Sequence, residues 1–150
     1  MLGRPTLVGP VGCGQLTKLC NQLIVDATIA IVAEALLLAQ AGDTNPAAMR
    51  TAIRAGFAES RILEVHGQRM LERNFLAGGQ VKSQAKDMDN VMRAVVDAGL
   101  LLPIAELIRT MYRDITQTLP EADHAAALLA LEATNLGQRV GDAPNQLPQT

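Results

Sequence analysis

Glycine and proline divide the chain into segments in which apolar residues recur with helical spacing. The longest uninterrupted segment runs from Gln15 to Gln40 and contains neither residue. With a rise of about 1.5 Å per residue, it would form a helix about 39 Å long. Its second half is apolar on nearly every side, which is typical of a helix surrounded by other helices or by a partner chain.

Capping residues predict where the shorter helices begin and end. Gly42 is expected to end the long helix, and Asn45-Pro46 to begin the next one, which stops near Gly56. A loop with a glycine pair is expected over residues 75–81. Asp123 is the expected cap of the last helix. The other helices are expected over residues 59–73, 83–98, 103–119 and 123–137.

This pattern predicts an all-α fold, a bundle of about six helices built round one long N-terminal helix. Residues 1–13 are expected to form a lead-in, extended over Leu2–Val8, and residues 14–140 the helical domain. Residues 141–150 are rich in Pro, Gln and Asn, which favours a disordered tail. One domain fits a length of 150 residues.

Composition supports helices and excludes some partners. Apolar residues make up 49% of the chain but aromatic residues only 2%, so the core must consist of Leu, Ala, Val, Ile and Met. Such side chains suit closely packed helices better than sheets. The net charge of −2 and the lack of a basic block disfavour nucleic-acid binding.

The remaining polar residues favour a cytoplasmic protein without a metal. Cys13 and Cys20 are too few for a disulfide scaffold and are not spaced as a metal-binding pair. His66 and His124 have no cysteine or aspartate at ligand spacing that would complete a metal site. The most apolar stretch is interrupted by Asp26, whose burial in a bilayer would cost about 2.5–3.5 kcal/mol. No membrane association is therefore expected.

A glycine-rich turn precedes the long helix and invites two motif interpretations that fail. A phosphate-binding loop requires Lys-Ser or Lys-Thr after its last glycine, but Gln15 and Leu16 follow Gly14. A dinucleotide fingerprint fits Gly12 and Gly14, but Thr17 stands at the third glycine position. No second strand follows it either, so neither motif is assigned.

The complete string from the turn into the helix reads GxxGxGxxxKxxNQ. Its specified residues are Gly9, Gly12, Gly14, Lys18, Asn21 and Gln22. It resembles the catalytic segment of the β-hydroxyacid dehydrogenases, which include 3-hydroxyisobutyrate, tartronate semialdehyde and 6-phosphogluconate dehydrogenases. The resemblance extends over about residues 3–135. It implies NAD or NADP as cofactor and a fold like the C-terminal domain of 6-phosphogluconate dehydrogenase.

The chemistry of that family explains the residue types in the string. Oxidation of a hydroxyacid removes the hydroxyl proton while a hydride leaves the same carbon, and a lysine can take that proton once its pKa falls from about 10.4 towards 7–8. Lys18 is the expected general acid/base. Asn21 and Gln22, three and four residues on, would bind the substrate from the same helix face. Gly12 and Gly14 would bring backbone N–H groups to its carboxylate.

Two later segments resemble other parts of the family. Lys86-Asp87 resembles a lysine-aspartate motif near substrate and cofactor, so both residues are expected to contact the cofactor. From the residues alone, Lys86 could equally be a solvated side chain at a helix start. Asp123-His124 resembles a final Asp-His-Ser-Ala segment, with Ala125 at the serine position.

Members of this family place a nucleotide-binding domain before the segment that this chain resembles. We therefore expect the C-terminal domain of an NAD(P)-dependent oxidoreductase that acts on a small β-hydroxyacid or semialdehyde and is inactive without the other domain. The alternative is a non-enzymatic helical oligomerisation module derived from such an enzyme. Either function predicts a homodimer or larger assembly, with residues 23–38 at or near the interface.

Overall fold

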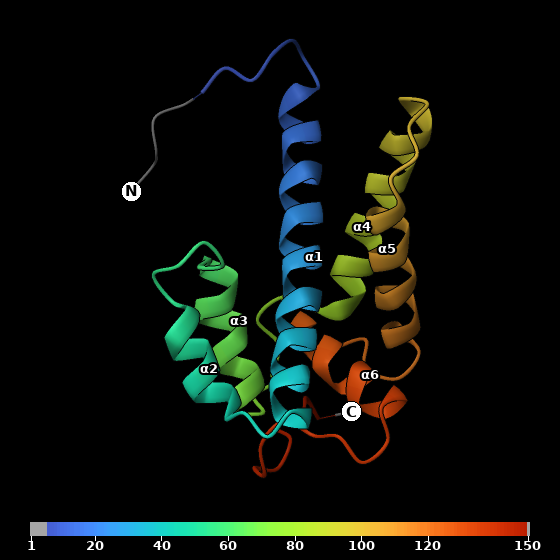
Figure 1. The fold of residues 1–150 in the computed structure, drawn as a ribbon. Helices are drawn as coiled ribbons and strands as arrows, with labels where there is room; N and C mark the ends of the chain where they lie inside the picture. Colours follow the sequence, from blue (N-terminus) through green and yellow to red (C-terminus); the bar gives the residue numbers. More distant parts are fainter. Residues whose placement is uncertain (1–5, 150) are drawn as a thin grey trace.

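The computed structural model describes residues 6–149 and is built of helices (Figure 1). Among these residues no strand is formed, which confirms the all-α prediction. Residues 2–5 of the predicted lead-in lie outside the described part, and residues 6–8 have no regular secondary structure. The elements are α1 (Cys13–Ala41), α2 (Pro46–Ile53), α3 (Arg61–Leu71), α4 (Val81–Asp97), α5 (Pro103–Thr116), the 3-10 turn η1 (His124–Ala126) and α6 (Ala127–Thr134).

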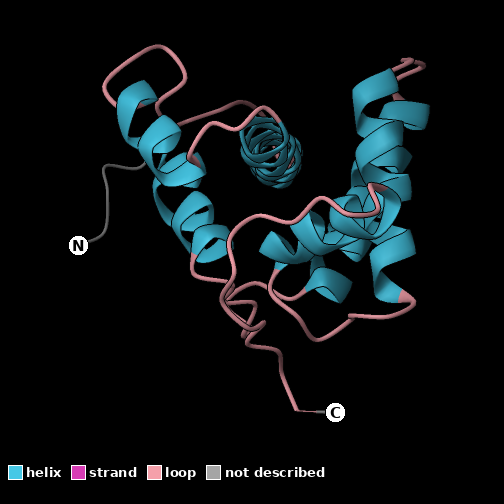
Figure 2. Ribbon diagram, turned by 60° about the horizontal axis from the view of Figure 1, so that its bottom comes forward, coloured by secondary structure: helices cyan, strands magenta, loops and turns pink. Residues whose placement is uncertain are grey.

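Helix α1 is the axis round which the other helices pack. It is 29 residues long. The pair α2 and α3 lies along one side of its C-terminal half, and the pair α4 and α5 lies on the other side (Figure 1). In a view close to the axis of α1, the helix stands between these two pairs (Figure 2). This arrangement explains why apolar residues occur on nearly every side of α1.

The core forms round α1, where the other helices pack against it. Ile29, Ala33 and Leu36 follow one another at steps of four and three residues and are almost completely buried. They belong to the same apolar cluster as Met70 of α3 and Met88 of α4. The core is made mainly of aliphatic and Met side chains, as the composition predicts, but Phe75 and Tyr112 are also fully buried in it.

Helix α1 is also long and apolar enough to cross a membrane. Its most apolar stretch has a mean hydropathy of 1.9. However, α1 contacts α2, α3, α4, α5 and α6, and Asp26 near its middle is completely buried against them. These contacts account for part of its apolar character, since 39% of this stretch is buried.

Side-chain caps begin the helices where the sequence predicts them. The Asn45 side chain accepts a hydrogen bond from Ala48 N at 2.9 Å, and the Asp123 side chain accepts one from Ala125 N at 3.0 Å. Gly42 ends α1, although the left-handed residue is its neighbour Asp43, with φ 57°. Each cap satisfies N–H or C=O groups that the helix itself leaves unpaired.

Two helices begin or end at residues other than those predicted, because long-range hydrogen bonds form there. Helix α4 begins at Val81, two residues before the predicted start, because Val81 N donates to Ala122 O and Lys82 N to Pro120 O. These bonds satisfy first-turn donors that would otherwise need a cap. Helix α5 ends at Thr116, before the predicted Leu119, because the chain turns here to reach the start of α4.

The C-terminal segment, for which the composition favours a disordered tail, is hydrogen-bonded to the body at Gln146. Gln146 N donates to Arg73 O, and Phe75 N donates to Gln146 O, both at 2.9 Å. The buried Arg73 guanidinium also donates to Glu132 Oε2 at 2.7 Å and to Val140 O at 3.0 Å. The polar composition of this segment does not reveal that the backbone of residues 73–75 supplies partners for it.

Candidate active site

The predicted substrate glycines lie at the open N-terminal end of α1. Gly12 is the N-cap of the helix and has φ 97°, a conformation that favours glycine. Gly14 lies in the first turn. Both are exposed, and a Cβ atom built at either position would meet nothing within 4 Å. The start of the helix is therefore accessible, as an anion site at a helix N-terminus would need to be.

The predicted catalytic residues meet α4 at what we call the α1–α4 junction, formed by Lys18, Gln22, Asp26, Gln84 and Asp87. Lys18 Nζ lies 3.9 Å from Asp87 Oδ1. Gln22 Nε2 donates to Asp87 Oδ2 at 3.2 Å. Residues predicted separately to bind substrate and cofactor thus share one site, because one face of α1 packs against one face of α4.

Two predicted site residues lie at the edge of this junction. Asn21 is exposed, and its side chain donates to Gln22 Oε1 at 3.1 Å. Lys86 is exposed and forms no ion pair or side-chain hydrogen bond with any residue of the described part. The amine of Lys18 is also accessible, with 58% of the side chain exposed. Its ion pair with Asp87 is therefore weak, and a ligand could replace it.

The buried end of the junction contains two residues that sequence analysis did not assign to a site. Asp26 is completely buried, and burial, followed by repulsion from Asp87, raises its pKa to about 8. Gln84 is buried between Gln22, Asp26 and His124. A signal for Asp26 exists in the sequence, since it stands eight residues after Lys18 and therefore close to the same helix face.

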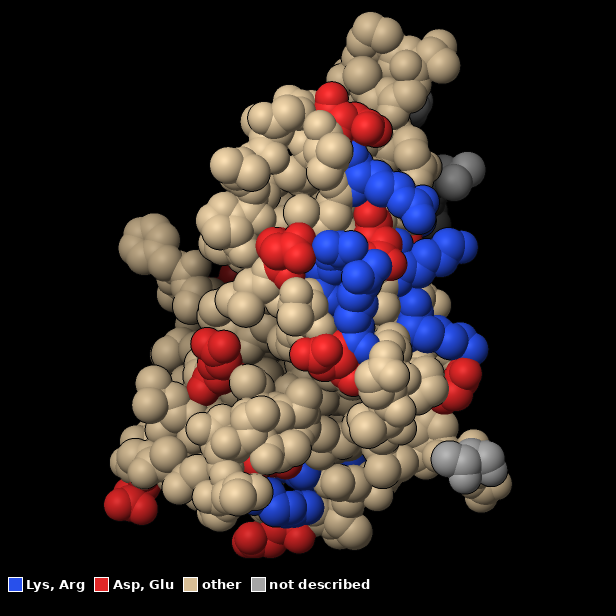
Figure 3. Space-filling view, turned by 90° about the vertical axis from the view of Figure 1, so that its right-hand side faces the viewer, with Lys and Arg blue, Asp and Glu red and all other residues tan. Residues whose placement is uncertain are grey.

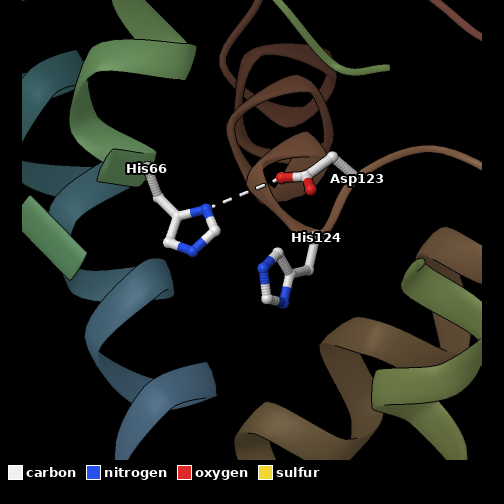
Figure 4. Close-up of side chains that lie close together, drawn as sticks. All are labelled: His66, Asp123 and His124. Atoms are coloured by element: carbon white, nitrogen blue, oxygen red, sulfur yellow. Dashed lines mark ion pairs between the residues drawn. The ribbon is translucent and has the colours of Figure 1, made fainter. Parts of the chain in front are cut away.

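A second polar cluster joins α3, the loop before α4 and the start of η1 (Figure 4). Asp123 Oδ2 accepts hydrogen bonds at 3.0 Å from the N–H groups of Gly78 and Gly79. Its Oδ1 lies 3.6 Å from His66 Nδ1 and 3.4 Å from Arg69 Nε. Burial by itself raises the pKa of Asp123, but the interaction with His66 and the backbone N–H groups of Ala125 and Gly79 hold this pKa well below its usual range.

This cluster has the residue types of a metal site but the surroundings of a structural one. His66, Asp123 and His124 place possible ligand atoms within 4.8 Å of one another. Asp123 is already occupied by N–H donors, and the Arg69 guanidinium next to it would repel a cation. Burial lowers the pKa of His124 to about 4, which keeps it neutral. We interpret Asp123 as a structural residue that connects the loop with Gly78 and Gly79 to α3.

The opposite face of α4 is closed by ion pairs with α5. Basic and acidic side chains alternate in a band across this face (Figure 3). Asp89 Oδ1 lies 2.9 Å from Arg109 Nε and 2.8 Å from an Arg113 nitrogen. Burial raises the pKa of Asp89, but hydrogen bonds from both arginines lower it, and the net pKa is below its usual value. The positive charge of this band is thus matched by carboxylates.

Comparison with known proteins identifies the family. A family model described as "NAD-binding of NADP-dependent 3-hydroxyisobutyrate dehydrogenase" matches residues 12–131. The chain belongs to this family. The 3-hydroxyisobutyrate dehydrogenases are among the β-hydroxyacid dehydrogenases, so the family predicted from the GxxGxGxxxKxxNQ string is confirmed. The matched part includes the α1–α4 junction and the Asp123 cluster.

Relatives of known name support the same family. The chain is 38% identical over 128 residues to 2-hydroxy-3-oxopropionate reductase of Escherichia coli, covering 85% of this chain and 44% of that protein. It is 31% identical over 137 residues to the probable mitochondrial 3-hydroxyisobutyrate dehydrogenase-like 1 of Arabidopsis thaliana, covering 90% and 41%. The chain therefore spans less than half the length of these relatives.

Solved structures of 3-hydroxyisobutyrate dehydrogenases have the same helical fold. The Salmonella typhimurium protein matches with a TM-score of 0.75 at 22% identity, covering 79% of this chain and 42% of that one. The Mycobacterium tuberculosis protein, solved with L-serine, also gives a TM-score of 0.75, at 19% identity, covering 83% and 45%. At these identities the likeness concerns the fold.

Proposed function

We propose that this chain is the helical catalytic part of an NAD- or NADP-dependent oxidoreductase that acts on a small β-hydroxyacid or the corresponding semialdehyde. The observation that carries the proposal is the meeting of Lys18 and Gln22 with Asp87 at one accessible junction. Membership of the 3-hydroxyisobutyrate dehydrogenase family and the likeness to a 2-hydroxy-3-oxopropionate reductase support this substrate class.

Lys18 has the position required of a general acid/base. Its accessible amine lies beside the Asp87 carboxylate at the edge of the junction. When a semialdehyde is reduced, Lys18 donates a proton to the carbonyl oxygen as the carbon gains a hydride. In the reverse direction it takes the hydroxyl proton. Asn21 and Gln22 orient the substrate oxygen, and the N–H groups near Gly12 and Gly14 bind its carboxylate.

The described residues fit only one edge of a nicotinamide cofactor. They contain no parallel sheet on which a dinucleotide would lie, so the main binding surface belongs to another part of the enzyme. Exposed Lys86, next to Asp87, is free to contact the cofactor from this side. When bound, a nicotinamide would provide the hydride chemistry, and Lys18 and its neighbours would transfer the proton and hold the substrate oxygen.

We further propose that a second copy of the chain covers one face of α1. Ile24, Ile31 and Leu38 follow at intervals of seven residues, and 67%, 61% and 75% of their surfaces are exposed. This spacing keeps the three side chains on one stripe of the helix, which two copies can bury against each other. The same stripe would serve the alternative function, a non-enzymatic oligomerisation module.

An activity experiment separates the two functions. The chain is joined to the part of the E. coli reductase that it does not cover, and NAD(P)H-dependent reduction of 2-hydroxy-3-oxopropionate is measured. We expect turnover, and at least a 100-fold lower kcat after Lys18→Ala, an effect of about the size that follows the loss of a general acid/base. Lys82→Ala, at an exposed lysine of α4 paired with Glu121, is the matched control. Equal rates in the two variants would contradict the proposed role of Lys18.

A further inference from the structure

The buried end of the α1–α4 junction brings oxygen atoms unusually close together. Gln84 Oε1 accepts a hydrogen bond from Gln22 Nε2 at 2.9 Å. The same oxygen lies 3.0 and 3.2 Å from the two carboxyl oxygens of Asp26. Amide and carboxylate oxygens are both acceptors, so this approach is unfavourable unless a proton lies between them. The other end of the Gln84 amide, its nitrogen, lies 3.1 Å from His124 Nδ1.

An ionised Asp26 would require the Gln84 amide to turn round. Its nitrogen would then face the carboxylate, but it would also face Gln22 Nε2 at 2.9 Å, donor against donor. If Gln22 turned as well, its oxygen would face Asp87 Oδ2, which its nitrogen now contacts at 3.2 Å. A negative charge on Asp26 therefore cannot be accommodated without loss of the hydrogen bond to Asp87.

A protonated Asp26 keeps the existing hydrogen bonds without any turn. Its O–H donates to Gln84 Oε1, which still accepts from Gln22. Gln22 keeps its bond to Asp87. The Gln84 nitrogen can donate to His124 Nδ1 when that imidazole is neutral and carries its proton on the other nitrogen.

The groups that face Asp26 from neighbouring helices favour the same state. Asp87 of α4 carries a negative charge that, after burial, contributes to the raised pKa of Asp26. Burial holds the pKa of Tyr112 on α5 well above its usual value, and burial lowers that of His124. Both therefore stay uncharged near neutral pH. Lys18 Nζ lies 3.9 Å from Asp87 Oδ1, and no cation is among the causes of the raised pKa of Asp26.

We propose that Asp26 is a positioning residue, held as a neutral carboxylic acid, whose O–H orients Gln84 and through it Gln22 and Asp87 beside Lys18. Loss of its proton turns the Gln84 amide and releases Gln22 from Asp87. The catalytic consequence rests on the proposed function of Lys18, whereas the hydrogen-bond arrangement does not.

The arrangement is tested by NMR on this chain. In the wild type, we expect the Asp26 side-chain carboxyl carbon to titrate with a midpoint near pH 8. The side-chain amide resonances of Gln22 and Gln84 move with the same midpoint. Asp26→Asn places an N–H donor where the acid O–H lies, so both amides become independent of pH across this range. Glu34→Gln, at an exposed carboxylate further along α1, leaves the wild-type titration unchanged.

Two results would overturn the inference. One is an Asp26 carboxyl carbon that titrates below about pH 5, near the ordinary range of aspartate. The other is a titration of both glutamine amides that persists in Asp26→Asn. The wild-type measurement decides the matter even if the variant does not fold.

The catalytic consequence is tested in the enzyme joined to its cofactor domain. The reaction is followed in the direction of hydroxyacid oxidation, in which Lys18 must be deprotonated and therefore limits the rate only on the acid side. In this direction the kcat/KM of the wild type should fall above about pH 8, and Asp26→Asn should remove this alkaline decline. Asp26→Ala should have a kcat/KM about 10-fold below that of Asp26→Asn, as for residues that orient a catalytic group. If the NMR result is as expected but Lys18→Ala stays active, the proposed function is wrong and the hydrogen-bond arrangement at Asp26 still holds. If Lys18→Ala is inactive and the NMR result fails, only this inference is lost.

Discussion

At the scale of single residues, Lys18 and Asp26 show how two turns of one helix produce opposite surroundings. Lys18 lies near the free end of α1 and is 58% exposed, whereas Asp26 lies where α4 and η1 cover the helix and is completely buried. An exposed amine can reach a substrate. A buried carboxyl favours its neutral form because the interior solvates charge poorly.

Lys18→Arg provides a stricter test of proton transfer than removal of the side chain. The arginine would keep a positive charge beside Asp87. However, arginine does not give up its proton near neutral pH, so we expect kcat of the joined enzyme to fall at least about 100-fold. Lys86→Arg is the comparison, and it should change the KM for the cofactor more than kcat. Steady-state kinetics separates the two effects, and a wild-type kcat in Lys18→Arg would exclude proton transfer by this residue.

The buried carboxyl of Asp26 should make the chain less stable as the pH rises. Its pKa is raised from 3.8 in the unfolded chain to about 8 in the folded one, so the folded state binds the extra proton between these values. Stability is then lost by up to about 1.4 kcal/mol per pH unit until the pH reaches the folded pKa. His124, lowered to about 4, has the opposite effect only below its unfolded value of 6.5.

Between about pH 6.5 and 8, the pH dependence of the free energy of unfolding should therefore come from Asp26 and not from His124. Urea denaturation across this window should give a falling free energy of unfolding for the wild type. Asp26→Asn, which cannot ionise, should give a nearly flat profile. A wild-type stability that rises with pH here would show that Asp26 is already ionised in the folded chain.

At the scale of elements, two sets of ion pairs differ in burial and therefore in how much the loss of one partner should destabilise the fold. Arg73 is 1% exposed and pairs with Glu132, which joins the end of α3 to α6 and to the C-terminal segment. Asp89 is 30% exposed and pairs with Arg109 between α4 and α5. Removing one partner of a buried pair leaves a charge without compensation, whereas an exposed charge is solvated by water.

Glu132→Ala should therefore destabilise the chain by about 3–5 kcal/mol, because it leaves the Arg73 guanidinium buried without a carboxylate. The C-terminal segment should also lose amide-exchange protection at Gln146, whose N–H bonds to Arg73 O. Asp89→Asn, the matched control, should cost at most about 1 kcal/mol. Chemical denaturation of both variants measures the difference, and equal losses would mean that burial of the pair is not what matters.

At the scale of the whole molecule, α1 has more apolar surface than its own chain covers. The stripe of Ile24, Ile31 and Leu38 is exposed, although Leu38 also lines a groove beside Leu131 of α6. Other large apolar residues, such as Leu101 between α4 and α5, are exposed at a separate end of the molecule. The regular spacing distinguishes the stripe on α1 as the surface suited to a second copy.

A charge in this stripe should dissociate the assembly. Ile31→Glu introduces a carboxylate at the centre of the stripe, where a partner helix would bury it without a counter-ion. We expect sedimentation equilibrium to show a dimer or larger species for the wild type and a monomer for Ile31→Glu. Leu101→Glu, at a residue that is 93% exposed, should leave the assembly intact. A monomeric wild type at micromolar concentration would contradict the proposed self-association.

Local patterns along the chain were sufficient for the helices and for the family. The absence of glycine and proline defines α1, and Asn45 and Asp123 cap their helices through contacts with residues two or three positions away. Such signals are visible in sequence because they depend on neighbours along the chain. The GxxGxGxxxKxxNQ string is also local, so the sequence alone is enough to select Lys18 and Gln22 as candidate site residues.

Only the tertiary structure decided which distant residues share a site and which charges are buried. The spacing of Asp26 from Lys18 places the two residues close to one helix face, but only the packing of α4 buries Asp26 against Gln84. The C-terminal segment has a polar composition that suggests disorder, but Arg73 supplies partners for it. Burial and long-range hydrogen bonds depend on how helices pack, and that information is spread over residues far apart in the chain.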